Sequence, residues 1–149
     1  MNKFNFKFKK AEMTDAELLF AWRNNIKARQ YSFNKTELEY TEHIEWLKNS
    51  LANKNRHILI IENDELKIGV LRIDIINDKL EVSIYLNPEL YGQGYGAKIL
   101  EMGIEYAKEN FPEADELEGK IMIDNVASQK VFLKAGFIEK YKVMAYKLK

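Results

Sequence analysis

Three glycines in alternate positions join an apolar stretch to a helical pattern, and this junction limits the fold more than any other part of the sequence. The apolar stretch ends at Leu86, the glycines are Gly92, Gly94 and Gly96, and the helical pattern starts directly behind them. Glycine tolerates positive φ and lets a ligand approach the bare backbone. A helix that begins here has unpaired amides at the positive end of its dipole. The junction therefore predicts a strand–loop–helix unit that binds a phosphate or pyrophosphate group.

Length and composition limit the number of domains and the kinds of ligand that the chain can bind. The chain has 149 residues, enough for one domain with its own core, which we place over 1–149. Its 23 basic and 23 acidic residues cancel, so no overall field favours nucleic acid. Cysteine is absent, which excludes disulfides and thiolate ligands, and His43 and His57 fit no metal-ligand spacing, so we expect no bound metal. We find no apolar run of membrane-spanning length and no signal-peptide core, and we expect a cytoplasmic protein without membrane contact.

Apolar residues alternate or recur at helical spacing in the segments that we expect to form regular structure. The expected strands cover residues 4–8, 57–61, 67–76, 79–86, 116–123 and 137–148, the last one undivided or split in two. A helix is expected to start at a capping box of Thr14 and Glu17, and the other helices cover 40–52, 97–109 and 127–135. Asn77 and Asp78 fit a two-residue hairpin turn. This order predicts an α/β fold of the mixed (α+β) kind, a mixed sheet flanked by helices.

Several ligands compete for the glycine loop. A P-loop needs a Lys followed by Ser or Thr, and the loop has neither. Gly92, Gly94 and Ala97 satisfy the dinucleotide pattern, but only 52 residues follow Ala97, too few for the further strand–helix units of that fold. The third ligand is coenzyme A, with its pyrophosphate on the amides of Gln93 to Ala97. A turn without ligand is the remaining alternative, which the entropy cost of three glycines disfavours.

At two segments the chain resembles the GNAT superfamily of acetyl-coenzyme A-dependent N-acetyltransferases. The first, Leu86 to Ala97, is similar to the family's strand–loop–helix motif with its Arg/Gln-x-x-Gly-x-Gly/Ala core. Gly94 and Gly96 match this core, and Tyr91 stands where Arg or Gln is usual. The resemblance covers the whole chain. It implies a GNAT-like fold with a central mixed, mostly antiparallel sheet of six or seven strands and about four helices.

The second segment is Asn125-x-x-Ser128-x-x-x-Phe132-x-x-x-Gly136-Phe137, which resembles the family's helix beside the pantetheine arm. Asn125 also fits an N-cap for that helix. Lys130 and Lys134 are spaced to meet the 3′-phosphate, or are simply solvated. The resemblance implies acetyl-coenzyme A as acetyl donor, held by Leu86, Tyr91, Gly92, Gln93, Gly94, Tyr95, Gly96, Ala97, Asn125, Ser128 and Phe132.

The family's usual proton donor to the departing thiolate is a tyrosine at the place of Phe132. Phenylalanine cannot donate a proton. A nearby hydroxyl such as Tyr141, or water, is the expected substitute. The resemblance also implies that a backbone amide at the end of the strand before the loop, here that of Leu86, donates to the oxyanion. The strand must splay from its neighbour to free this amide.

Glu81 is the candidate general base, because an amine must lose a proton before it attacks a thioester. The expected hairpin sets residues opposite one another when their numbers sum to 155, so Asp74 faces Glu81 and Arg72 faces Ser83. Two neighbouring carboxylates raise each other's proton affinity. The alternative for Asp74 and Arg72 is a solvated polar face with a charge pair.

A third stretch, from Trp22 to Leu47, resembles a GNAT branch that acetylates the 4-amino group of nucleotide-linked amino sugars in pseudaminic acid type pathways. Arginines there can hold phosphates, and Trp22 or Trp46 can offer a platform for a base or sugar. Both tryptophans equally fit core positions, and His43 fits a surface or capping position. The candidate acceptor-binding residues are Arg23, Asn24, Arg29, Ser32, Phe33, His43 and Arg72.

These patterns predict acetyl transfer to a primary amine, with a nucleotide-activated amino sugar as the first candidate acceptor. The alternatives are a protein N-terminus, a polyamine or an antibiotic as acceptor, and a non-catalytic acetyl-coenzyme A sensor. A dinucleotide enzyme is the remaining alternative outside the family. We expect a monomer or a homodimer, because edge strands favour pairing.

Overall fold

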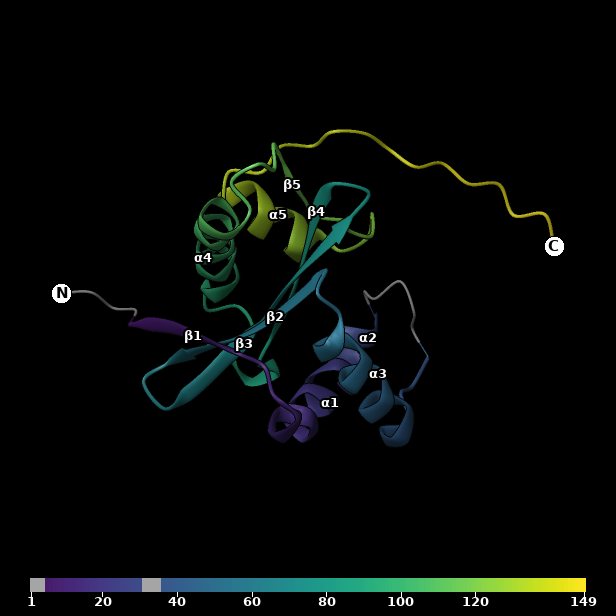
Figure 1. Ribbon diagram of the computed structural model, residues 1–149. Coiled ribbons are helices and arrows are strands. Elements are labelled where there is room, and N and C mark those ends of the chain that lie inside the picture. Colours follow the sequence, from purple (N-terminus) through teal and green to yellow (C-terminus); the bar gives the residue numbers. More distant parts are fainter. Residues whose placement is uncertain (1–4, 31–35) are drawn as a thin grey trace.

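A computed structural model describes residues 5–30 and 36–149 of the chain (Figure 1). Its helices are α1 (Ala16–Asn24), α2 (Ile26–Gln30), α3 (Tyr40–Ala52), α4 (Tyr95–Asn110) and α5 (Val126–Lys134), with short 3-10 turns at η1 (Met13–Asp15) and η2 (Pro88–Leu90). Its strands are β1 (Phe6–Lys10), β2 (Arg56–Asn63), β3 (Leu66–Ile76), β4 (Lys79–Leu86) and β5 (Leu117–Glu118). Every helix within the described residues is too short or too polar to span a bilayer.

The strands form one sheet in the order β1-β2-β3-β4-β5. The first three pairings are antiparallel and the last one, between β4 and β5, is parallel. The mixed, mostly antiparallel sheet is therefore confirmed. Asn77 and Asp78 both have positive φ (50° and 65°), as a type I′ hairpin turn requires. The turn sets the expected register, in which Asp74 pairs with Glu81.

Helices cover both faces of the sheet and divide the core in two (Figure 1). On one face α1 and α3 enclose a cluster of buried side chains that includes Trp22, Leu47 and Val70. On the other face α4 and α5 pack over a larger cluster that includes Leu71 and Leu100. Buried side chains run almost continuously along β3 and supply both clusters, because neighbouring residues of a strand point to opposite faces.

Two helix starts differ from expectation. The capping box joins Glu12 and Asp15 instead of Thr14 and Glu17, and the amide of Glu12 donates to Asp15 Oδ2 at 2.8 Å. Asp15 is buried and also receives Lys9 at 3.1 Å, a partner on β1 that local spacing does not show. Helix α4 starts two residues before the expected Ala97.

The sheet has five strands in the described residues, so the expectation of six or seven is not met. The strand expected at 116–123 shortens to β5, and the C-terminal segment forms no strand; Phe4 lies outside the described residues. Alternation alone predicted a final strand over 137–148, but a strand also needs a partner for its backbone groups. The described chain has five α-helices where about four were expected, because α2 follows α1 after a single residue.

Candidate active site

The glycine loop ends in an uncapped helix. Gly94 is the N-cap of α4 with φ of +81°, and Gly92 has φ of +78°, so both adopt the left-handed conformation that favours glycine. A glycine offers no side chain to the first amides of α4, and the first turn carries no acidic residue. An added Cβ at either glycine would meet no atom within 4 Å. The open, uncapped helix start therefore fits an anionic group such as pyrophosphate.

Gly96 serves a different purpose. A Cβ at this position would lie 2.9 Å from Cγ1 of Val131 on α5, closer than real Cβ atoms approach their neighbours. Gly96 and Ala97 are both buried. The third glycine of the loop thus lets α4 and α5 pack closely, and the two elements that carry the family motifs are held together at this point.

Side chains brace both ends of the loop. Asn87 accepts from the amide of Glu89 at 3.1 Å and donates to the backbone carbonyl of Lys67 at 3.1 Å, which ties η2 to the start of β3. Tyr91 is half-buried, and burial raises the pKa of its hydroxyl. Lys27 Nζ lies 5.6 Å from the centre of the Tyr91 ring. Tyr91 therefore links the loop to α2. Gln93 is exposed between the two open glycines.

The amide of Leu86 points to an uncovered edge of β4. Asn87 donates its amide to the carbonyl of Ile68 on β3 at 2.8 Å. Successive amides of a strand point to opposite sides in the plane of the sheet, so the amide of Leu86 points away from β3. On that side, within the described residues, β5 pairs with β4 only at Leu80–Leu117 and Glu81–Glu118. The geometry is that of a splayed strand end.

Helix α5 borders this edge. Asn125 is its N-cap and accepts from the amide of Ser128 at 3.1 Å, so the capping alternative for Asn125 is confirmed. Phe132 is buried and packs edge-on against Phe137, with ring centres 4.8 Å apart. A Cβ at Gly119 would lie 2.2 Å from the Phe132 ring. This glycine makes room for an aromatic ring where α5 meets the chain behind β5. Lys130 and Lys134 are both exposed.

Glu81 and Asp74 pair across the hairpin as expected, but each has its own cationic partner. Lys120 Nζ lies 3.3 Å from Glu81 Oε2. Asp74 is buried between two arginines: its Oδ1 lies 2.7 Å from Arg56 Nε, and its Oδ2 lies 3.2 Å from Arg72 Nε. Asp74 is thus part of a charge cluster, as the alternative of a charge pair expected, but it is buried and not on a solvated face.

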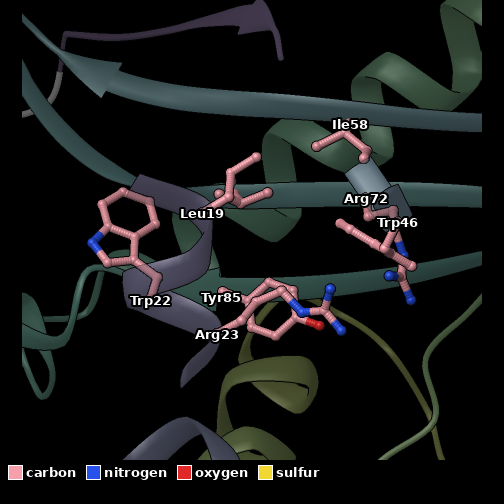
Figure 2. Close-up of a pocket in the computed structure, with 8 residues that line it drawn as sticks. Leu19, Trp22, Arg23, Trp46, Ile58, Arg72 and Tyr85 are labelled. Atoms are coloured by element: carbon pink, nitrogen blue, oxygen red, sulfur yellow. The ribbon is translucent and has the colours of Figure 1, made fainter. Parts of the chain in front are cut away.

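A small pocket, with room for about one water molecule, lies between α1, α3 and the sheet. Figure 2 shows the side chains that line it, with the Tyr85 hydroxyl directed toward the Arg23 guanidinium and Trp22 turned away from both. The residues that line it are Leu19, Trp22, Arg23, Trp46, Ile58, Val70, Arg72 and Tyr85. Tyr85 directly precedes Leu86 in β4, so the pocket adjoins the strand end whose amide is uncovered.

Three guanidinium groups surround the ring of Trp46. The Cζ of Arg23 lies 4.2 Å from the ring centre, and those of Arg56 and Arg72 lie at 5.7 and 5.9 Å. Burial lowers the pKa of Arg23; the Tyr85 hydroxyl opposes this shift, and the charge of Arg72 adds to it. An arginine stays protonated in proteins, so the lowered pKa reflects a charge that burial separates from water. The cluster is suited to an anionic group.

The remaining acceptor candidates differ in placement. His43 is buried, and its ring stacks against Trp46 with 5.7 Å between the ring centres, so it helps to hold Trp46 in place. The Asn24 side chain accepts from the amide of Leu38 at 2.9 Å. The Arg29 Nε donates to the carbonyl of Asn24 at 3.1 Å. The structure therefore groups Arg23 and Arg72, with His43 behind them, and leaves Asn24 and Arg29 in backbone contacts at the C-terminal end of α1.

The last three candidates are Ser32, Phe33 and Tyr141. Ser32 and Phe33 are outside the described residues. Tyr141 is largely exposed on the C-terminal segment, which runs away from the domain in Figure 1. Sequence reasoning missed Arg56 and Tyr85. Arg56 directly precedes the strand that was expected over 57–61, and its partners Asp74 and Ser50 (2.9 Å) come from other elements.

Comparison with known sequences gives a family match over most of the chain. A profile described as "Acetyltransferase (GNAT) domain" matches residues 6–138. The chain is 27% identical over 131 residues to a protein named "Acetyltransferase PseH" from Campylobacter jejuni subsp. jejuni serotype O:23/36 (strain 81-176). That match covers 87% of this chain and 81% of the relative.

Solved structures share the fold at low identity. A spermidine N-acetyltransferase from Vibrio cholerae, in complex with CoA and spermine, superposes with a TM-score of 0.82 at 17% identity, covering 91% of this chain and 82% of that one. The aminoglycoside acetyltransferase AAC(6')-Ib in complex with coenzyme A gives 0.81 at 17% identity, covering 93% and 87%. These structures share the arrangement of strands and helices described above.

Proposed function

The chain belongs to the GNAT acetyltransferase family, and from this premise we propose that its acceptor is the 4-amino group of a nucleotide-linked amino sugar. It is an acetyl-coenzyme A-dependent N-acetyltransferase of this family. The observation that carries the choice of acceptor is the group of Arg23, Arg56 and Arg72 around Trp46. One guanidinium group can bind two phosphate oxygens at once, and an indole ring packs against a base or sugar.

The charge of this cluster favours a diphosphate over a polycation. The cluster holds three arginines, Arg23, Arg56 and Arg72, and one carboxylate, Asp74, which pairs with the last two. Positive charge therefore exceeds negative charge within the cluster. A polyamine or an aminoglycoside carries several positive charges, which this cluster would repel. The similarity to a protein named Acetyltransferase PseH supports the same acceptor branch that the stretch from Trp22 to Leu47 resembles.

The acetyl donor fits the other end of the site. The amides of Gly96 and Ala97 at the start of α4, to which the N-cap Gly94 offers no side chain, would hold its pyrophosphate, with Gly92 and Gly94 leaving room for it. When bound, acetyl-coenzyme A supplies the thioester whose acyl carbon the amine attacks. Helix α5, with Ser128 near its start, would flank the pantetheine arm, as the family resemblance implies.

Proton transfer is assigned to this chain's own groups. Glu81 accepts the proton that the acceptor's ammonium group must lose before attack, directly or through a water. The amide of Leu86 donates to the thioester oxygen as negative charge grows on it. The thiolate that departs takes a proton from water, since Phe132 has none to give and Tyr141 is largely exposed on the C-terminal segment.

A panel of acceptors tests the proposal. Thiol release from acetyl-coenzyme A would be measured with a UDP-linked 4-amino sugar, spermidine, an aminoglycoside and a peptide with a free N-terminus. Release with the UDP-linked sugar alone is the expected result. Release with spermidine, an aminoglycoside or the peptide in its place would assign the alternative acceptor. Tight binding of acetyl-coenzyme A without release for any acceptor would point to a sensor and overturn the proposal.

A further inference from the structure

The glycine loop carries no cation of its own. Residues 87–97 contain one charged side chain, that of Glu89, and it is acidic. Lys98, the first cation behind the loop, has its Nζ 3.6 Å from Glu101 Oε2 and lines a groove together with Phe8 of β1. Backbone amides at a helix start attract an anion but do not neutralise the charge of a pyrophosphate. A cation is therefore expected to come from another element.

Helix α2 places a lysine at this loop. The Nζ of Lys27 lies over the ring of Tyr91, 5.6 Å from the ring centre. Tyr91 directly precedes Gly92, the first of the two glycines with positive φ at the open side of the loop. Lys27 is exposed, and none of the ion pairs among the described residues includes it. Its charge is therefore available to a ligand.

Hydrogen bonds fix the backbone from which Lys27 extends. The amide of Lys27 donates to Asn25 Oδ1 at 3.0 Å, and the amide of Arg29 donates to the carbonyl of Asn25 at 3.0 Å. The Arg29 side chain donates back to the carbonyl of Asn24 at 3.1 Å. These contacts hold the start of α2 against the end of α1. The backbone of Lys27 is thus fixed, while its flexible side chain can still move toward an anion.

The Tyr91 ring holds the ammonium group beside the loop without neutralising it. Tyr91 is half-buried, so its ring has a fixed place next to the glycines. The face of an aromatic ring attracts an ammonium group, but only weakly where water has access. A phosphate oxygen attracts the same group more strongly, because both partners of the hydrogen bond are charged. A phosphate bound at the loop would therefore draw Lys27 from the ring.

We propose that Lys27 of α2 binds the pyrophosphate of the acetyl donor and supplies the positive charge that the glycine loop lacks. Tyr91 keeps the ammonium group of Lys27 at the loop before the donor arrives. Tyr91 also stands where the resembling family usually has Arg or Gln, so α2 contributes a cation that the loop itself does not carry. The inference concerns the donor and does not depend on which acceptor the enzyme uses.

Two donor fragments test which phosphate Lys27 contacts. Calorimetry without acceptor would measure binding of coenzyme A and of 3′-dephospho-coenzyme A. Lys27→Met keeps most of the side chain and removes its charge, and it is expected to weaken both ligands about tenfold or more. Lys108→Met, at an exposed lysine near the far end of α4, is the matched control and should bind both ligands normally. Weaker binding of coenzyme A alone would move the contact to the 3′-phosphate, and unchanged binding of both would exclude Lys27; either result overturns the proposal.

A rescue experiment separates a charge for the phosphate from a contact that only shapes the loop. The double variant Lys27→Met/Tyr91→Arg carries a guanidinium group in the loop itself, and it is expected to recover most of the lost affinity for both ligands. Lys27→Met/Tyr91→Leu, which also lacks the ring but adds no charge, should stay as weak as Lys27→Met. A merely structural contact between Lys27 and Tyr91 cannot be restored by replacing both residues. Equally weak binding in the two double variants would therefore contradict the proposal.

Discussion

The guanidinium of Arg23 on α1 lies over the ring of Trp46 on α3, with 4.2 Å between Cζ and the ring centre. The two helices cover the same face of the sheet, and this contact joins them above the pocket. His43 stacks under the same ring at 5.7 Å. The tryptophan is therefore held in one orientation by a cation on one residue and an aromatic ring on another.

Trp46→Leu should weaken acceptor binding and leave donor binding unchanged. The substitution removes the aromatic face, whose contact with a guanidinium is worth about 0.5–2 kcal/mol. We expect KM for the acceptor to rise about tenfold, while KM for acetyl-coenzyme A stays the same. Trp46→Phe, which keeps an aromatic face, is the matched control. Its KM for the acceptor should lie between that of the unmodified enzyme and that of Trp46→Leu. Equal rises in both KM values would show that the residue only stabilises the fold.

Gly94 and Gly96 should respond differently to alanine. At φ of +81°, Gly94→Ala strains the backbone by about 1–2 kcal/mol and misdirects the first amides of α4, so KM for acetyl-coenzyme A should rise. Gly96→Ala meets Val131 at 2.9 Å and should lower the free energy of unfolding by about 1–3 kcal/mol.

The double variant Gly96→Ala/Val131→Ala provides the control. Removing the two methyl groups of Val131 makes room for the added Cβ, so chemical denaturation should recover part of the lost stability. Gly94→Ala should gain nothing from Val131→Ala. Recovery in both backgrounds would mean that the two glycines have the same role.

Glu81→Gln should lower kcat about a hundredfold or more at neutral pH, the usual size of a general base contribution. The acid limb of the pH profile of kcat/KM should also disappear. Glu118→Gln is the matched control, because Glu118 pairs with Glu81 across the strands and has its own lysine partner, Lys140. The pH profile of kcat/KM in Glu118→Gln should keep the shape that the unmodified enzyme shows. An unchanged profile in Glu81→Gln would remove this residue from the mechanism.

Stability should fall as the pH drops below about 6.5. Burial lowers the pKa of His43 in the folded state, and the charge of Arg23 lowers it further. Burial and Lys10 lower the pKa of His57. Both histidines therefore bind protons more readily in the unfolded chain, whose histidine pKa is 6.5. The two histidines contribute fully to the free energy of unfolding above that pH, and this contribution is lost as the pH falls below it.

Melting temperature between pH 7.5 and pH 5 measures this effect. The decrease should be smaller in His43→Gln and smaller again when His57→Gln is added. A decrease of unchanged size in the double variant would assign the pH dependence to other groups. Asp15, whose pKa is lowered, loses its contribution only in the more acidic range below its ordinary value of 3.8.

Local patterns predicted the parts of the structure that depend on local contacts. The turn residues Asn77 and Asp78 set the register of the whole hairpin, because side chains on a strand have a period of two. Asn125 caps α5 through an amide only three residues away. Gly94 starts α4 with the positive φ that its position required.

The arginine cluster and the final segment could not be predicted in this way. Arg56 acquires its role only when β2 pairs with β3 and brings it to Asp74, which is 18 positions away. Asp15 displaces the expected capping residue because Lys9 and Lys67 meet it from two strands. Residues 137–148 alternate like a strand, but no pattern within them says where their backbone partner lies.

The most direct test compares two acceptors that differ only in the nucleotide. kcat/KM would be measured for a UDP-linked 4-amino sugar and for the same amino sugar without its nucleotide, in the unmodified enzyme and in Arg23→Met. We expect the unmodified enzyme to prefer the nucleotide-linked acceptor about a hundredfold, and Arg23→Met to lose about tenfold of that preference, since one charge-assisted contact is worth about 1.5–3 kcal/mol. Equal kcat/KM values for the two acceptors in the unmodified enzyme would contradict a nucleotide-linked substrate.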